Sequence, residues 1–334
     1  MTGEAPLDAV EALLLDEAAA LPDAVVVVDA PALAAHLSLQ APVSGWCDSA
    51  VEHERLPAAV QVPPLTAPPS AGAEPLVVYR LPKALAALDE MAALSAGQGG
   101  RLLVGGRVKD LRHSMTDVLK RHFGEVSASR GVRKARVLRG NAPLPPSHQR
   151  WPKHRHHADL DLTLVAHGAT FGGTRIDPGT RLLIAHLDEV GGDTVTDLGS
   201  GNGTLAALLA RAGRRVSATD VSWAAVASTR ATALANGLHI DTFWANGLQA
   251  LPDNSQDAIV TNPPFHQGVA KESGPTLAMF TDARRVLRPG GEFWCVFNSH
   301  LPWRLELERR VGPTRVIDQN PRFTLTVSRS RAQR

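Results

Sequence analysis

An asparagine, two prolines and a phenylalanine follow directly after an apolar run in the last third of the chain. The run Ala258–Val260 predicts a buried parallel strand, which leads through one threonine into Asn262-Pro263-Pro264-Phe265. In open α/β sheets, ligands bind beyond the carboxyl ends of the strands. The two prolines fix φ and remove N–H donors, so the turn is stiff and presents carbonyl oxygens. The pattern therefore predicts a binding site at this strand end.

The chemistry that this turn suits is alkylation of a planar amine. The exocyclic amine of a nucleobase is a poor nucleophile because its lone pair is delocalised into the ring, but it has two hydrogens to donate. The side-chain oxygen of Asn262 and the backbone carbonyl of Pro263 can accept both, and so hold the nitrogen for attack on a methyl sulfonium. Phe265 can stack on the face of the base. The alternative is a stiff loop in which Asn262 is a turn residue and Phe265 a core residue.

A glycine-rich segment upstream favours the first interpretation. The segment Thr194–Asp197 predicts a strand, the segment 197–203 reads D-x-G-x-G-x-G, and an apolar helix is expected from Thr204 to Leu209. The glycines Gly199, Gly201 and Gly203 permit a tight turn and close approach of a ligand, and the helix N-terminus offers free N–H groups. The spacing differs from the G-x-G-x-x-G of dinucleotide enzymes.

Two further polar residues follow the neighbouring strands. Asp220 ends a predicted strand that begins at Arg215, and a carboxylate there can accept hydrogen bonds from both hydroxyls of a ribose. Asn246 follows the strand Ile240–Ala245, where its amide can meet the edge of an adenine. The alternative roles are caps at strand ends for Asp197 and Asp220, and a turn residue for Asn246.

Composition limits the class of protein that can carry these motifs. The chain has 334 residues, of which 44% are hydrophobic, which is room for two domains, and no apolar run is long enough to span a bilayer. Cys47 and Cys295 are far apart in sequence and support neither a disulfide framework nor a zinc site, so we expect the protein to be located in the reducing cytoplasm. His148, His154, His156 and His157 lack the spacing of metal ligands, so no metal is expected.

The formal net charge of +2 hides a strong asymmetry along the chain. Residues 1–75 hold eleven acids and one base, whereas residues 101–155 hold fourteen arginines and lysines and three acids. Such a basic block supplies many groups that pair with phosphates, and we expect it to bind RNA, although an ordinary solvated face is the alternative. The residues expected to contact RNA are Arg130, Arg133, Lys134 and Arg136.

The first half of the chain repeats the order of elements seen around the asparagine. A strand Leu76–Tyr79, a turn with proline, a helix, Gly99-Gly100 and a strand Arg101–Val104 match Ile259 to Phe297 in that order, which indicates a duplication. Arg80 stands where Asn262 stands, and no glycine-rich segment precedes it, so the first copy is expected to be catalytically silent. We expect a first domain at 1–145, a basic linker at 146–160 and a catalytic domain at 161–334.

With these residues in hand, the second half resembles class I S-adenosylmethionine-dependent methyltransferases. The whole chain resembles the ribosomal RNA guanine methyltransferases of the RsmC and RlmG type. The residues that carry the closer resemblance are Asp177-Pro-Gly-Thr180, Thr261-Asn-Pro-Pro-Phe-His266, Asn298-Ser-His300-Leu-Pro302 and Asn320-Pro-Arg-Phe323. The resemblance implies two tandem Rossmann-like folds. The first is degenerate, and the second is a seven-stranded mixed sheet that ends in a β-hairpin.

The resemblance also implies roles for individual residues. Asp197 and the three glycines would hold the methionine part of S-adenosylmethionine, Asp220 its ribose and Asn246 its adenine. Asn262 and Pro263 would hold the target amine and Phe265 would stack on the base, while His266 either contacts the base or caps the next helix. The implied activity is methylation of the 2-amino group of a guanine in ribosomal RNA or a ribosomal subunit, by a monomer.

Two rival functions share parts of this pattern. Methyltransferases that act on an adenine amine or on a protein glutamine also use Asn-Pro-Pro followed by an aromatic residue, more often tyrosine. An RNA-binding assembly factor could keep the fold without catalysing any reaction. The phenylalanine and the duplicated half favour the ribosomal RNA function, and the presence of Asp197, Asp220 and Asn262 argues against the assembly factor.

Overall fold

The computed structural model describes residues 6–18, 24–63, 74–145, 151–263 and 274–331. The chain divides into two compact units, one formed by 1–151 with 167–169, the other by 152–166 with 170–334. The expected division into two domains with a linker at 146–160 stays a prediction. The structure departs from it at one point, because residues 153–157 form a strand rather than a linker. Among the described residues, no helix is both long and apolar enough to cross a membrane.

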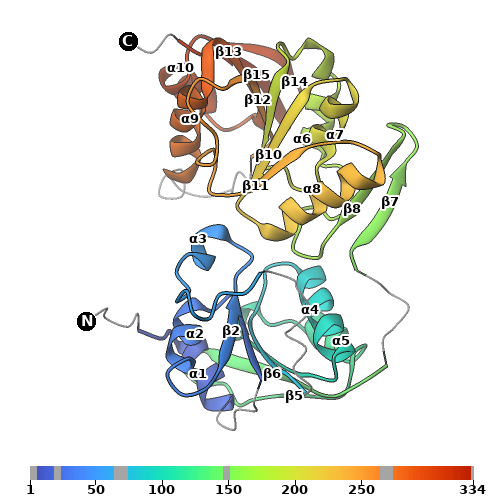
Figure 1. Cartoon of the computed structure of the whole chain (residues 1–334), viewed down its shortest axis with the longest axis vertical. Helices are drawn as coiled ribbons and strands as arrows, with labels where there is room; N and C mark the ends of the chain where they lie inside the picture. Colours follow the sequence, from blue (N-terminus) through green and yellow to red (C-terminus); the bar gives the residue numbers. More distant parts are fainter. Residues whose placement is uncertain (1–5, 19–23, 64–73, 146–150, 264–273, 332–334) are drawn as a thin grey trace. The chain divides into compact units, whose positions relative to one another are not determined.

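The second unit is built on a seven-stranded sheet (Figure 1). Its order is β11-β10-β9-β12-β13-β15-β14; the first five strands are parallel and β15 runs antiparallel to both of its neighbours. This arrangement confirms the predicted mixed sheet with its C-terminal hairpin. The strands are β9 (Thr194–Leu198), β10 (Arg215–Asp220), β11 (Asp241–Trp244), β12 (Gln256–Thr261), β13 (Leu287–Asn298), β14 (Thr314–Gln319) and β15 (Phe323–Arg329).

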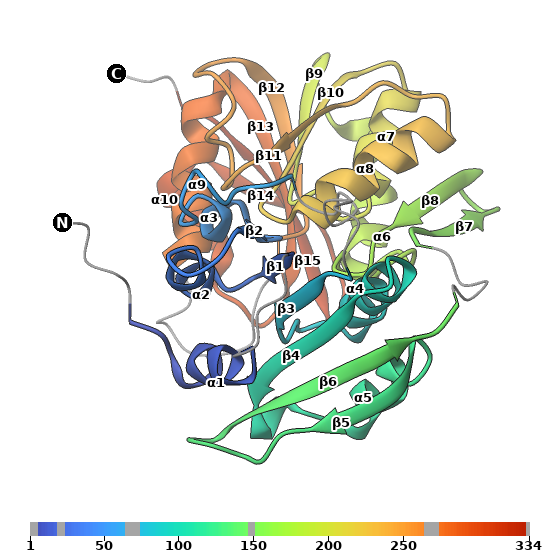
Figure 2. The same cartoon turned by 60° about the horizontal axis from the view of Figure 1, so that its bottom comes forward.

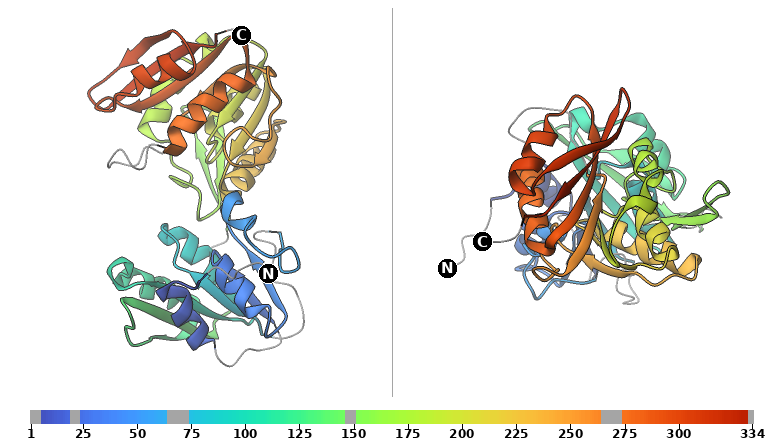
Figure 3. Two further views of the ribbon diagram at one scale, coloured as in Figure 1. Left: turned by 90° about the vertical axis from the view of Figure 1, so that its left-hand side faces the viewer. Right: turned by 90° about the horizontal axis from the view of Figure 1, so that it is seen from above.

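Helices cover both faces of this sheet (Figure 3). Because side chains alternate along a strand, Ala258 and Val260 pack on the face covered by α6 and α7, whereas Ile259 packs against Phe280 of α9 on the other face. Both faces are therefore buried, as the apolar run in β12 predicts. The helices are α6 (Pro178–Ile184), η2 (Leu187–Glu189), α7 (Thr204–Arg211), α8 (Trp223–Ala235), α9 (Gly274–Val286) and α10 (Trp303–Arg310).

A separate hairpin precedes the large sheet in the second unit. Its strands β7 (Lys153–His157) and β8 (Leu162–Ala166) pair antiparallel, with Lys153 opposite Ala166. The hairpin is attached to α8, because the Asn236 side chain bonds the backbone of Thr163 and the Thr232 hydroxyl accepts from the Val165 N–H. The basic residues of β7 are thus held on a folded support.

The first unit repeats the topology of the second with one strand fewer. Its sheet order is β2-β1-β3-β4-β6-β5, in which β1 to β4 run parallel and β6 runs antiparallel to β4 and β5. The elements are α1 (Ala9–Glu17), β1 (Val25–Val28), α2 (Pro31–Leu37), β2 (Val43–Trp46), α3 (Ala50–His53), β3 (Leu76–Arg80), α4 (Leu85–Gly97), β4 (Arg101–Arg107), η1 (Val108–Asp110), α5 (His113–Leu119), β5 (Phe123–Ala128) and β6 (Ala135–Pro143).

The position that matches Asn262 has a structural use in the first unit. Strand β3 takes the place of β12, and Arg80 ends it. The Arg80 guanidinium lies 2.6 Å from the Asp8 carboxylate and 4.0 Å from that of Glu11, both at the start of α1. The loop after β1 holds Asp29 and Ala30 in place of a glycine-rich turn. The first unit is therefore a degenerate copy that lacks the groups expected to bind a cofactor.

Candidate active site

The glycine-rich loop follows β9 and adopts a conformation that its glycines make possible. Gly199, Gly201 and Gly203 have φ values of 73°, 55° and 77°, the left-handed region that side chains disfavour. A Cβ on Gly203 would also lie 2.9 Å from the Cα of Thr229, so glycine lets α7 begin close to α8. The expected free N–H groups are largely used within the protein, because those of Gly199 and Ser200 donate to the Thr219 carbonyl, that of Gly203 to the Ser200 carbonyl and that of Gly201 to Asp220.

Asp197 lies beneath this loop with only 1% of its surface exposed. Its Oδ2 accepts a hydrogen bond of 3.0 Å from the backbone N–H of Ala206, which fixes the first turn of α7. Burial raises the pKa of Asp197 to about 7, the Ala206 hydrogen bond opposes this shift, and the neighbouring charge of Asp220 adds to it. The carboxyl group is therefore poised to change its protonation state near neutral pH when a charge enters beside it.

Asp220 is held in orientation by hydrogen bonds to the loop that it faces, and Asn246 follows β11, the neighbouring strand. The two carboxylate oxygens of Asp220, at the end of β10, accept from the backbone N–H groups of Gly201 at 3.0 Å and Ser222 at 2.9 Å. Asn246 is exposed after β11, and neither it nor Asp220 nor Gly203 is among the residues that line the cleft described below. The ribose role of Asp220 and the adenine role of Asn246 both stay predictions.

The Asn262 carboxamide is held in one orientation by two residues of the α6 N-terminus. Its Nδ2 donates to Asp177 Oδ1 at 3.0 Å and to Thr180 Oγ1 at 2.9 Å. Because a carboxylate only accepts, the group that faces Asp177 must be the NH₂ and not the oxygen. Within the described residues no donor pairs with the Asn262 Oδ1. Gly179 leaves space beside this oxygen, since a Cβ there would lie 3.3 Å from it.

One cleft brings the glycine loop and Asn262 together. Strand register places the ends of β9, β10 and β12 side by side, with Leu198 opposite both Thr219 and Thr261. The cleft is lined by Phe171, Gly172, Arg175, Ile176, Asp177, Thr180, Asp197, Gly199, Ser200, Gly201, Asn202, Thr204, Leu205 and Asn262. Asn262 thus lines the same cleft as a loop of the type that binds nucleotide cofactors.

Comparison with known proteins matches both units of the chain. Residues 161–327 match the Methyltransferase small domain, and residues 6–144 match the RLMG N-terminal domain. The ribosomal RNA large subunit methyltransferase G of Streptomyces coelicolor is 36% identical over 267 residues, which cover 75% of this chain and 70% of that protein. The Magnetococcus marinus protein of the same name is 31% identical over 96% of this chain and 92% of its own length. The chain belongs to the ribosomal RNA large subunit methyltransferase G family.

A solved structure also matches this family member over both units. It is the 16S ribosomal RNA N2 guanine methyltransferase RsmC of T. Thermophilus, in complex with AdoMet and guanosine. The match has a TM-score of 0.81 at 25% sequence identity and covers 97% of this chain and 92% of that one. The predicted pair of methyltransferase folds is confirmed by this likeness.

The residues expected to bind the target amine are described only in part. Asn262 is partly exposed at the cleft and Pro263 is buried. Phe265 and His266 lie outside the described residues, so the stacking role of Phe265 stays a prediction. An aromatic residue that sequence reasoning missed is Phe171, which lines the cleft with 76% of its surface exposed. Its position after an irregular segment gave no periodic signal that would have marked it.

The residues expected to contact RNA lie on the hairpin of β5 and β6 in the first unit (Figure 2). Val132 and Ala135 exchange backbone hydrogen bonds of 2.9 and 2.8 Å across a two-residue turn. Arg133 and Lys134 form that turn with φ values of 47° and 63°, the left-handed region in which Asn-Gly is preferred. Two exposed cations therefore occupy a turn that favours other residues.

The other members of the basic block differ in their surroundings. Arg130 is exposed, whereas Arg136 is partly buried and its Nε has no hydrogen-bond partner within the described residues. Arg139 forms a paired contact with Glu17 at 2.7 and 2.8 Å, so it ties β6 to α1. The charge available to RNA on this hairpin is therefore smaller than the count of basic residues suggests.

Proposed function

We propose that the protein transfers the methyl group of S-adenosylmethionine to the 2-amino group of a guanine in large-subunit ribosomal RNA. The observation that carries the proposal is the Asn262 carboxamide, which lines the cleft shared with the glycine loop and is anchored through its NH₂ to Asp177 and Thr180, so that its oxygen has no donor within the described residues. The relatives named as large subunit methyltransferases and the RsmC complex with AdoMet and guanosine support the same activity.

The residues of the cleft fit the proposed cofactor. Asp220 would accept hydrogen bonds from the ribose hydroxyls, and Gly199 and Gly201 carry no side chain that would block a ligand over the loop. Asp197 would supply a negative charge toward the positively charged methionine part. Asn246 is proposed at the adenine. When bound, the cofactor supplies a methyl group on a sulfonium as the electrophile.

The chain's own residues would hold the amine for the transfer. The Oδ1 of Asn262 and, in the proposal, the carbonyl of Pro263 each accept one hydrogen of the guanine NH₂, which directs its lone pair at the methyl carbon. Phe265 would stack on the base. The new C–N bond would form as the methyl C–S bond breaks with its electron pair left on sulfur, so the positive charge would pass to the nitrogen, which would then lose one proton to solvent. No general base is then required.

The experiment that tests the function uses labelled S-adenosylmethionine with separated ribosomal subunits and with naked ribosomal RNA. The proposal predicts label on a guanine of the large-subunit RNA, and label on adenine or on protein would support the rival enzymes. Absence of transfer together with RNA binding would support an assembly factor. The expectation of a monomer that needs no metal stays a prediction, which size-exclusion chromatography and activity in EDTA can check.

Cofactor affinity is expected to depend on pH through Asp197. Its pKa is raised to about 7, so the empty site is partly protonated at neutral pH. A cationic ligand favours the carboxylate and lowers this pKa, so binding releases a proton and affinity rises as the pH rises through about 7. If the pKa falls by about one unit, affinity gains about fivefold between pH 6 and 8.

Calorimetry at the two pH values, in buffers of different ionisation enthalpy, measures this proton release. The amino group of the cofactor also titrates and adds its own pH dependence to the affinity, so Asp197→Asn is the control. The affinity of this variant should keep the pH dependence that the amino group causes and lose the part that Asp197 causes. Equal pH dependence in the wild type and in Asp197→Asn would contradict the role given to this carboxyl group.

The hairpin of the first unit offers a test that separates charge from fold. The double variant Arg133→Asn with Lys134→Gly should weaken RNA binding and lower the slope of log affinity against log salt by about two. Because Asn-Gly is preferred in this turn, the free energy of unfolding of the double variant should equal that of the wild type or exceed it by up to about 1 kcal/mol. Filter binding over a salt series and thermal melts give both quantities, with Arg55→Gln as a control. Unchanged affinity and slope would remove this hairpin from the RNA surface.

A further inference from the structure

A second hollow in the second unit adjoins the proposed active site. It is bounded by the β7–β8 hairpin on one side and by the segment that leads into α6 on the other. Its lining is Arg155, His156, His157, Ala158, Asp159, Arg175, Ile176 and Arg181, and we call it the arginine groove. Arg175 and Ile176 also line the cleft that holds Asn262, so the groove and the cleft are neighbours that share part of one wall.

The walls of the arginine groove are fixed to the catalytic loop by hydrogen bonds. The buried His157 donates from Nε2 to the Thr174 carbonyl at 2.8 Å, since a carbonyl can only accept. The Asn202 side chain, within the glycine-rich loop, donates to the carbonyls of Gly173 and Arg175 at 2.8 and 3.0 Å. The hairpin, the segment 173–175 and the glycine loop therefore keep fixed positions relative to one another.

The groove carries more positive charge than its own contacts neutralise. Arg181 pairs with Asp159 at 2.7 Å, the one acid in the lining. Arg155 and Arg175 are exposed, and within the described residues neither has an ion pair. His156 lies 3.9 Å from Asp161, a contact that gains charge only when the imidazole is protonated. Two guanidinium groups are thus available to an anion that enters the groove.

We propose that the arginine groove binds the phosphodiester backbone of single-stranded RNA next to the target guanine. This inference rests on the proposed function. A base that reacts in the cleft must be turned out of any stack, and the phosphates on either side of it then lie close to the cleft mouth. Guanidinium groups suit phosphate because they donate two parallel hydrogen bonds. Arg175, which borders both hollows, would contact the phosphate nearest the guanine, and Arg155 a phosphate farther along the chain.

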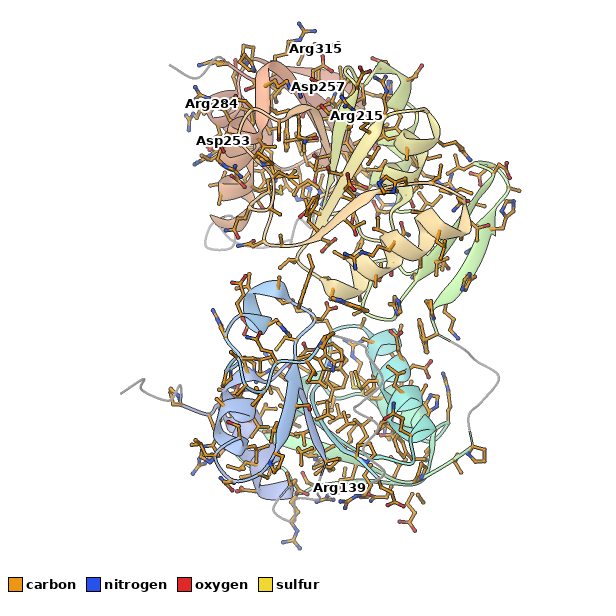
Figure 4. All side chains as sticks on the ribbon, in the orientation of Figure 1. Arg139, Arg215, Asp253, Asp257, Arg284 and Arg315 are labelled. Atoms are coloured by element: carbon orange, nitrogen blue, oxygen red, sulfur yellow. The ribbon has the colours of Figure 1, made fainter. Side chains whose placement is uncertain are left out.

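The test compares Arg155→Gln, Arg175→Gln and the double variant with the wild type. Each single change should raise KM for an RNA substrate and Kd for a single-stranded RNA oligonucleotide by about tenfold, and lower the salt slope by about one. For Arg155→Gln, which lines the arginine groove alone, the value of kcat at saturating RNA and the Kd of S-adenosylmethionine should stay unchanged, whereas Arg175 also lines the cleft, so its variant is assessed by the RNA Kd and the salt slope. Matched controls are Arg215→Gln and Arg315→Gln, since both arginines lie at the amino-terminal end of the parallel strands, with Asp257 (Figure 4). Both should behave as the wild type.

The outcomes separate this proposal from the proposed function. If the wild type methylates ribosomal RNA and the double variant keeps the wild-type KM, Kd and salt slope, the groove is not an RNA site although the function stands. If the wild type methylates no RNA, the proposed function fails, and the Kd values for the oligonucleotide alone show whether the arginine groove binds RNA. A loss of affinity as large in Arg215→Gln as in Arg175→Gln would show a general charge effect and overturn the proposal.

Discussion

Replacement of Asn262 with alanine is expected to lower methyl transfer to RNA by at least about 10²- to 10³-fold, the cost of removing one directed hydrogen-bonding group from an active site. The loss should appear in kcat, because the side-chain oxygen would hold the amine in line for attack rather than bind the RNA. The Kd of S-adenosylmethionine should remain within about twofold, since the glycine loop and Asp220 make no hydrogen bond to Asn262 within the described residues. Single-turnover transfer and calorimetry measure the two quantities.

A matched variant distinguishes the loss of the carboxamide's hydrogen bonds from the loss of side-chain volume. Asn262→Asp keeps the shape of the side chain and its acceptor oxygen, but it replaces the NH₂ with an oxygen that lies about 3 Å from the Asp177 carboxylate, and such a pair shares a proton or separates. This variant should therefore also be strongly impaired although nothing is truncated. Activity of Asn262→Ala within about tenfold of the wild type, with normal cofactor binding, would contradict the role given to Asn262.

Thr180→Val is expected to reduce kcat by about 3- to 10-fold with little change in KM for RNA, the loss of one neutral hydrogen bond. Valine has the shape of threonine but accepts no hydrogen bond, so the Asn262 Nδ2 would keep only Asp177 as partner. Asp177→Ala should cost about 10- to 100-fold, because a charge-assisted bond is stronger. It also removes the α6 cap to the Gly179 N–H, and so about 1 kcal/mol of stability.

Two comparisons test whether Thr180 and Asp177 act by orienting the Asn262 carboxamide. Thr180→Ser restores the hydroxyl and should recover most of kcat, which a merely structural role of the threonine methyl group would not explain. Thermal melts of Asp177→Ala give the stability lost with the cap, so that its kcat can be compared under conditions where the variant is folded. A Thr180→Val enzyme with wild-type kcat would show that Asn262 needs no second anchor.

The fold was predictable because its signals are local. The apolar run before Asn262 reads as a strand buried on both faces, and the glycine spacing reads as a turn onto a helix. The repeated order around Leu76–Tyr79 and Ile259 predicted the shared topology, because β3 and β12 hold the same place in their sheets. Each of these patterns depends on periodicity or on backbone conformation, which the sequence carries directly.

The contacts that orient the site were not predictable in the same way. Asp177 and Asn262 are 85 positions apart, and only the packing of α6 at the end of β12 brings them together. The motif Asp177 to Thr180 carries part of the family resemblance, but its residue types alone indicate no role. The strand Lys153–His157 was expected to be linker because its composition is basic and polar, and its pairing with Leu162–Ala166 outweighs that composition. In the basic block, Arg139 is held by Glu17, a partner 122 positions away.

The central claim is that the Asn262 oxygen and a backbone carbonyl hold the 2-amino group of a guanine before a methyl donor. Its most direct test is mass spectrometry of nucleosides from large-subunit ribosomal RNA incubated with S-adenosylmethionine and either the wild type or Asn262→Ala. We expect N2-methylguanosine with the wild type and none above background with the variant. Methylated adenosine, or equal N2-methylguanosine from both proteins, would contradict the account.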